Sequence, residues 1–147
     1  MKAVHDERGH KFEGPLIRDM HEYQKKTGCG VTAAREHFAE RFRSNRAFKN
    51  RIGGYYVLEF DRSAVSHGIF SSFLTGDIDG LLLTTDGFYR SVDIFEMFDD
   101  DAALMRAAKS SGLAAVWEEI SRRERGDPEC LKYPRTKQFD DCSAVLG

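Results

Sequence analysis

The sequence lacks any apolar run that could cross a membrane. A spanning helix needs roughly 20 mostly apolar residues, and no stretch of the 147 residues approaches that length. The first residues, Met1-Lys2-Ala3-Val4-His5, also lack the apolar core of a signal peptide. These two absences predict a cytoplasmic protein with no membrane partner.

Cysteine is scarce, and its three residues stand apart from one another. Cys29, Cys130 and Cys142 form no Cys-x-x-Cys pair, so a zinc ribbon is excluded as a reading of the sequence. An odd count without close spacing also argues against a disulfide framework. We expect three reduced thiols.

No single sign of charge dominates, and several catalytic signatures are missing. The formal net charge of -2 argues against a dedicated nucleic-acid binder. The sequence contains no Gly-x-Ser-x-Gly elbow, no Walker loop and no histidine pair spaced for metal binding. Nucleophilic hydrolases and nucleotide-binding proteins are therefore without support.

One local exception to this charge balance lies in residues 35–51. Six basic residues stand there against two glutamates: Arg35, Arg41, Arg43, Arg46, Lys49 and Arg51. Such a cluster is usually the solvated face of a helix, but it could also contact phosphates of a nucleic acid or a phosphoprotein. Both interpretations stay open from the sequence.

What the sequence does contain is typical of one globular domain, which we expect to span residues 1–147. With 41% hydrophobic and 31% charged residues, a chain of this length can bury a core. Gly9 and the Gly14-Pro15 pair predict a strand, a turn and an extended segment over residues 2–17. A short helix is expected over 19–26 and a longer one over 33–49.

The middle of the chain predicts an antiparallel meander. Residues 55–60, 65–74 and 81–85 are rich in aromatic, β-branched or leucine residues, and turn residues separate them. The last of these runs is continuously apolar, which predicts a central strand covered on both faces. Helical spacing follows in 88–98 and 111–125, and residues 140–146 return to a strand. The fold class is therefore α+β, an antiparallel sheet with packed helices.

Two motifs place acidic residues beside apolar runs. They are Leu81-Leu82-Leu83-Thr84-Thr85-Asp86-Gly87-Phe88 and Phe139-Asp140-Asp141-Cys142-Ser143-Ala144-Val145-Leu146. A carboxylate at the end of a strand is held by the sheet yet open to solvent, as in many sites for hard cations. The alternatives are a hairpin turn at Asp-Gly and a solvated loop before the last strand.

These two motifs, in this order, resemble the C-terminal half of bacterial phosphatase 2C-like proteins of the metal-dependent PPM family. The segment Asn45-Arg46-Ala47-Phe48-Lys49-Asn50-Arg51-Ile52-Gly53-Gly54-Tyr55 is similar to a stretch of the bacterial branch. The resemblance runs from about residue 45 to 147. It implies half of an α-β-β-α sandwich, in which two sheets pack face to face between helices.

The resemblance also implies a site and an activity. Asp86 and Asp140 match family positions that bind Mg²⁺ or Mn²⁺, and Asp141 either supports them or exchanges roles with Asp140. Proteins of the family hydrolyse phosphoserine and phosphothreonine in phosphoprotein substrates. The early acidic motif, the phosphate-binding arginine and the early Asp-Gly pair of the family are absent before Asn45, so we expect an incomplete hydrolase domain.

This departure leaves a second function open. A half-fold without catalysis would be a protein-protein interaction module, a homo-oligomer or a heteromer that associates through its exposed sheet. Two further acidic segments have simpler explanations: Asp99-Asp100-Asp101 is expected to cap a helix, and Asp77-x-Asp79 lacks the glutamate of a calcium loop. Trp117 is expected in the core.

Overall fold

The computed structural model describes residues 2–60 and 62–147. It divides the chain into two compact units, residues 2–72 and residues 73–147, and each is described by itself. The first unit is helical, and the second combines helices with a two-stranded antiparallel sheet. The expected α+β class agrees with this architecture, while the expectation of one domain stays a prediction.

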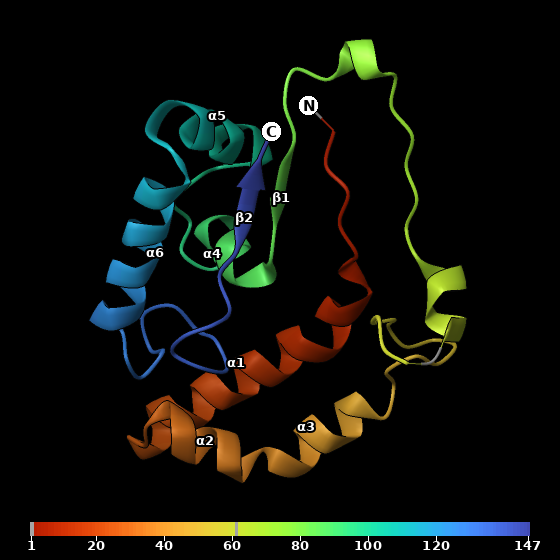
Figure 1. The fold of residues 1–147 in the computed structure, drawn as a ribbon. Helices are drawn as coiled ribbons and strands as arrows, with labels where there is room; N and C mark the ends of the chain where they lie inside the picture. Colours follow the sequence, from red (N-terminus) through yellow and green to blue (C-terminus); the bar gives the residue numbers. More distant parts are fainter. Residues whose placement is uncertain (1, 61) are drawn as a thin grey trace. The chain divides into compact units, whose positions relative to one another are not determined.

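The first unit is built on three helices, α1 (His10–Thr27), α2 (Val31–His37) and α3 (Ala39–Arg46) (Figure 1). The strand and turn expected over residues 2–17 are wrong, because α1 continues through Pro15. Leu16, Met20 and Gln24 lie one helical turn apart and are buried. The burial of this stripe outweighs the backbone hydrogen bond that Pro15 cannot make.

The helix expected over 33–49 is present but interrupted. Phe38 has φ -94° and ψ 14°, which separates α2 from α3. Val31 and Ala34 are buried, and Phe38 packs edge-on against Tyr23 of α1. Val31, Ala34 and Phe38 therefore form an apolar stripe on this helical region.

The strands expected over 55–60 and 65–74 are not formed. Apart from an isolated bridge between Lys49 and Tyr55, the described part of this region holds only 3₁₀ turns, at Arg62–His67 and Thr75–Asp77. Leu58 is 85% exposed and Phe70 80%. Their residue types favour a strand only when a neighbouring strand pairs with them, and the described residues supply none.

The second unit contains, in order, β1 (Leu82–Thr84), α4 (Asp86–Asp93), α5 (Asp101–Ser111), α6 (Leu113–Gly126) and β2 (Ala144–Leu146). In Figure 1 the three helices lie to one side of the strand pair. A core cluster holds them together: Phe88, Phe95, Leu104, Val116 and Ile120. The helix expected over 88–98 is only partly formed, because α4 ends at Asp93. Phe88 lies in α4 and Phe95 follows it, and both are buried.

The sheet of this unit is smaller than expected. Its register pairs Leu82 with Leu146, Leu83 with Val145 and Thr84 with Ala144. The expected three-stranded meander is therefore wrong; β1 pairs with the C-terminal strand instead. Only one face of β1 is covered, so the expectation of a strand buried on both faces is also wrong.

The side chain of Trp117 is 48% exposed, so its placement in the core is wrong. The three cysteines are free thiols, as expected, and burial raises the pKa of the Cys130 thiol to about 11. Among the described helices, none combines the length and apolar composition that a membrane crossing requires.

Candidate functional site

The two acidic motifs lie side by side at one end of the strand pair. The Thr85 amide donates to the Ser143 carbonyl at 3.0 Å, and the Thr85 hydroxyl donates to the Asp141 carbonyl at 2.9 Å. The Ser143 amide in turn donates to the Thr85 Oγ1 at 3.0 Å. Segments more than 50 residues apart in the sequence thus meet at this point.

Gly87 allows these segments to approach closely. A Cβ atom at this position would lie 2.3 Å from the Asp141 carbonyl oxygen and 3.2 Å from the Asp140 Cβ. Only glycine fits this contact without a backbone shift. Because α4 begins at Asp86, directly after β1, the alternative of a hairpin turn at Asp86-Gly87 is wrong.

The three carboxylates at this end have different surroundings. Asp86 and Asp141 are exposed, and the Gly87 amide donates to Asp86 Oδ1 at 2.9 Å. Asp140 is mostly buried, with 12% of its side chain exposed. The Arg90 Nη2 donates to its Oδ2 at 2.7 Å, while the Lys137 ammonium pairs with its Oδ1.

Arg90 connects this end of the sheet to the core. Its side chain is 8% exposed, and its Nη1 donates to Glu124 Oε1 on α6 at 2.8 Å. The Asp141 amide donates to Asp140 Oδ1 at 2.9 Å. Every oxygen of the Asp140 carboxylate therefore has a donor, and the two cations Arg90 and Lys137 balance the two carboxylates of Asp140 and Glu124.

The carboxylates are the kind of ligand that Mg²⁺ and Mn²⁺ take, so the donor chemistry suits the expected metal. Their number and arrangement do not make a complete centre. Within residues 2–60 and 62–147, no group of three or more His, Cys, Asp or Glu side chains is placed to hold one ion. Asp86, Asp140 and Asp141 thus provide part of a metal site at most, and their role as ligands stays a prediction.

Other candidates from the sequence have structural roles. The Asp100 carboxylate accepts from the Ala103 amide at 2.7 Å, so the capping interpretation of the triple aspartate is confirmed. In the basic segment, Arg41 pairs with Asp19 and Lys49 with Glu59. These ion pairs agree with the interpretation of a solvated helix face.

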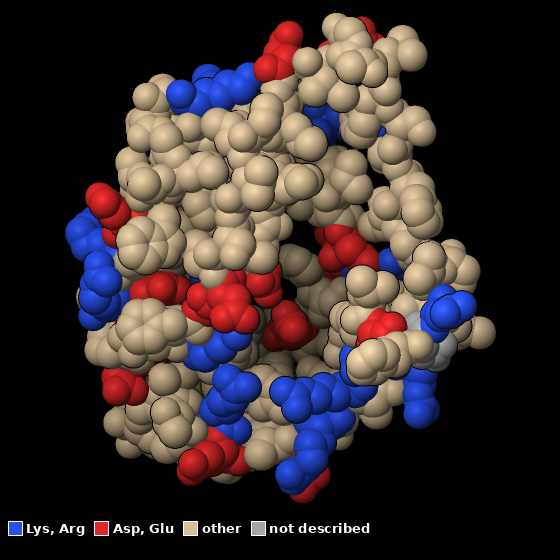
Figure 2. Space-filling view, in the orientation of Figure 1, with Lys and Arg blue, Asp and Glu red and all other residues tan. Residues whose placement is uncertain are grey.

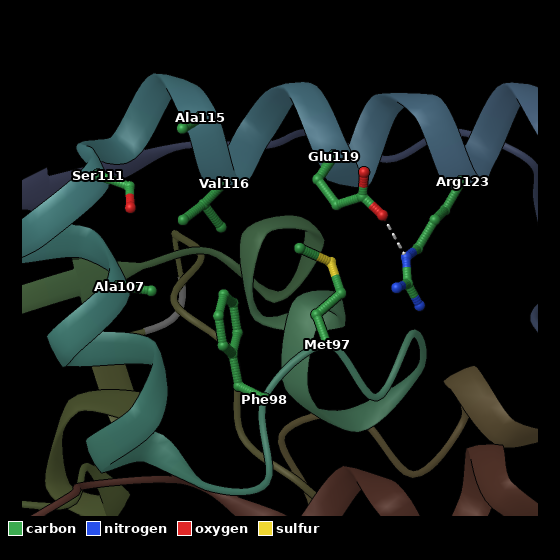
Figure 3. A pocket seen from close by; sticks show the side chains of 8 residues that line it. All are labelled: Met97, Phe98, Ala107, Ser111, Ala115, Val116, Glu119 and Arg123. Atoms are coloured by element: carbon green, nitrogen blue, oxygen red, sulfur yellow. Dashed lines mark hydrogen bonds and ion pairs between the residues drawn. The ribbon is translucent and has the colours of Figure 1, made fainter.

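An open cleft of about 310 Å³ lies between α5 and α6. Figure 3 shows Met97, Phe98 and Val116 around it, with Glu119 and Arg123 joined by an ion pair at one end. Hydrogen bonds from Arg122 and then from Arg123 lower the pKa of Glu119 to about 2. The carboxylate therefore stays charged and paired with these two arginines.

Sequence reasoning did not find Arg90 or Glu124. Arg90 lies between Tyr89 and Ser91, and Glu124 lies in a run of charged residues, 122–125, so nothing local distinguishes either of them from a surface residue. Their burial depends on the placement of the C-terminal segment, which brings Asp140 to Arg90 across 50 residues.

Comparisons with known proteins give no relative for this chain. No family model, no curated protein and no solved structure matches it.

Proposed function

We propose that this protein works by association with another protein chain through the uncovered face of its β1–β2 sheet. Leu81, Leu83 and Val145 share that face and are 54%, 57% and 63% exposed. On the opposite face, Leu82 and Ala144 pack against the core. The proposal rests on one observation: both faces of the sheet are apolar, but only one of them is covered.

Physical chemistry favours a partner on this face. Complete burial of a leucine or valine side chain stabilises by about 1.5–3 kcal/mol, and contiguous apolar surface of this kind promotes association. The surface over β1 and β2 in Figure 2 is uncharged. No lysine or arginine interrupts either strand, so one common protection of an edge strand against pairing, a charged side chain, is missing.

The backbone of β1 supports the same conclusion. Leu81 and Gly147 exchange two hydrogen bonds of 2.8 and 2.9 Å. In an antiparallel pair such residues alternate with residues whose backbone groups point outward, so the N–H and C=O groups of Leu82 and Thr84 point away from β2. The sheet of this protein therefore offers an extended segment of a partner both an apolar face and an edge with free hydrogen-bonding directions.

Light scattering over a range of concentrations tests the association. We expect the parent protein to form a dimer or larger assembly, and Leu83→Lys to shift it toward the monomer because an ammonium group cannot be buried unpaired. Leu131→Lys is the matched control, since Leu131 is 43% exposed in a loop away from the strands. A parent protein that stays monomeric at all concentrations contradicts the proposal.

A second candidate function is the Mg²⁺- or Mn²⁺-dependent hydrolysis of phosphoserine or phosphothreonine in proteins. The meeting of Thr85–Gly87 with Asp140–Ser143 supports it, because the resemblance to the phosphatase 2C family rests on these two motifs. In this proposal Asp86, Asp140 and Asp141 supply carboxylates, and an associated chain supplies the remaining ligands and the phosphate-binding group.

Thermal unfolding with millimolar Mn²⁺ tests the metal part of this candidate. A cation that binds only the folded state must raise the melting temperature, and we expect a rise of about 2–4 °C for the parent. Asp86→Asn should remove most of the rise. An equal rise in parent and variant would show that the cation binds elsewhere. Hydrolysis of p-nitrophenyl phosphate that survives Asp140→Asn would assign that activity to a contaminant.

A further inference from the structure

We infer that Arg90 is the positioning residue for the acidic end of the sheet, because one guanidinium holds both Asp140 and Glu124. The two bonds, 2.7 Å from Nη2 to Asp140 and 2.8 Å from Nη1 to Glu124, join the C-terminal segment to α4 and α6. This inference does not depend on the proposed association or on a bound metal.

Because the charged groups of this bridge are buried, each of them needs a partner of opposite charge. The side chains of Arg90 and Glu124 are each 8% exposed, and that of Asp140 is 12% exposed. Lys137 adds a second cation at Asp140, so two positive and two negative charges balance. A buried charge that loses its partner costs far more than the pair contributes, and without Arg90 the Asp140 carboxylate keeps only the half-exposed Lys137 as a cationic partner.

The shape of arginine matters as well as its charge. A planar guanidinium presents donors in fixed, separate directions, whereas a lysine ammonium is a single point of charge on a flexible stem. Here each terminal nitrogen serves a different carboxylate. A lysine at position 90 therefore cannot reproduce the bridge, even though it keeps the charge.

The position of the other two carboxylates follows from that of Asp140. Asp141 is its neighbour in the chain, and the Asp141 carbonyl accepts the Thr85 hydroxyl and contacts Gly87. Asp86 lies between Thr85 and Gly87 in the sequence. When Arg90 holds the Oδ2 atom of Asp140, it therefore also holds the contact between the two acidic motifs. The Oδ1 atom of Asp140 faces the half-exposed Lys137.

A double-mutant cycle in the presence of EDTA tests the bridge. Arg90→Gln, Asp140→Asn and the double variant are compared by urea unfolding in the Leu83→Lys background, which removes any contribution from association. We expect Arg90→Gln to raise the unfolding equilibrium constant roughly 100-fold or more. The double variant should raise the unfolding equilibrium constant by less than the product of the increases in the two single variants. Arg122→Gln, at an exposed pair, is the control with a change below about fivefold.

Amide hydrogen exchange distinguishes positioning from general stability. In Asp140→Asn and in Arg90→Lys, the Ser143 and Val145 amides should exchange at least about tenfold faster than the loss of global stability explains, while amides of α5 follow global stability. These two variants also replace Arg90→Gln in the test if that variant does not fold.

Three results would overturn the inference. One is a double variant whose unfolding equilibrium constant rises by the full product of the increases in the two single variants. Another is exchange at Ser143 and Val145 that follows α5 in every variant. The third is full restoration of their slow exchange by Arg90→Lys, since charge alone would then suffice. A monomeric parent, or one indifferent to Mn²⁺, affects only the proposed functions and leaves this test unchanged.

Discussion

At the scale of single residues, the carboxylate of Asp127 organises the loop after α6. It accepts from the amides of Leu131, Lys132 and Tyr133 at 2.9, 3.1 and 3.0 Å. The Arg135 Nη1 donates to it at 2.6 Å, and the Arg135 side chain is only 2% exposed. Burial alone would raise the pKa of Asp127, but the hydrogen bonds from Arg135 and from these backbone amides lower it below its usual value.

This pKa gives a pH dependence with a definite sign. A carboxyl group whose folded-state pKa is lowered contributes its full stability above the unfolded value of about 3.9 and loses it as the pH falls through the folded value. We expect Asp127→Asn to lower the free energy of unfolding by about 3 kcal/mol at pH 7, because it leaves Arg135 buried without its anion. The difference from the parent should shrink below about pH 4.

Urea unfolding at pH 7 and pH 3 measures the loss of unfolding free energy in Asp127→Asn and its dependence on pH. Asp99→Asn is the control, because Asp99 is exposed and lies outside this loop. The same penalty for Asp127→Asn at both pH values would show that the ionised carboxylate is not what stabilises the loop.

At the scale of elements, the start of α4 is where the two acidic motifs touch. The missing side chain of Gly87 leaves room for the Asp141 carbonyl. Because α4 packs into the core through Phe88, it cannot move aside to admit a larger residue without disturbing that core. The contact between α4 and the C-terminal segment is therefore sensitive to a single methyl group.

Gly87→Ala is expected to lower the free energy of unfolding by about 1–3 kcal/mol, as overpacking of a filled site does. Gly126→Ala is the matched control, since a Cβ atom at Gly126 meets nothing within 4 Å. That substitution should be neutral or stabilising by up to about 1 kcal/mol. Equal effects of the two substitutions in chemical denaturation would contradict the close contact at Gly87.

The same elements show what a sequence can predict. The start of α5 and the end of α6 follow from local signals, namely the capping Asp100 and the Gly126-Asp127-Pro128 break. The helix expected over 19–26 lies inside α1, but the first half of α1 was missed because Gly14-Pro15 is also a turn signal, and only the burial of Leu16 and Met20 overrides it. Helices with local caps are predictable; helices held by distant contacts are not.

The strands and the site depend on contacts between distant residues. Residues 55–60 and 65–74 have strand-forming composition, yet no described strand pairs with them. The apolar run 81–85 was predicted as a strand, but its pairing with residues 144–146 was not. The meeting of the two acidic motifs was expected from the carboxylates beside apolar runs and from the family resemblance, whereas the bridge through Arg90 had no signal in the sequence.

At the scale of the whole molecule, charge is divided between the two units. Residues 2–72 contain thirteen Lys and Arg against nine Asp and Glu, whereas residues 73–147 contain nine against fifteen. Each copy of the chain therefore offers a basic and an acidic unit. A second copy supplies charge of the opposite sign to either unit, which favours the encounter of two copies.

Photo-crosslinking tests this central claim most directly. With 4-benzoylphenylalanine at position 83, irradiation should join two copies, and the joined peptides should include residues 81–85 or 143–147 of the second copy. The same amino acid at position 131, which is exposed but away from the sheet, should give little product. Equal yields at the two positions, or no joined copies at position 83, would contradict the account.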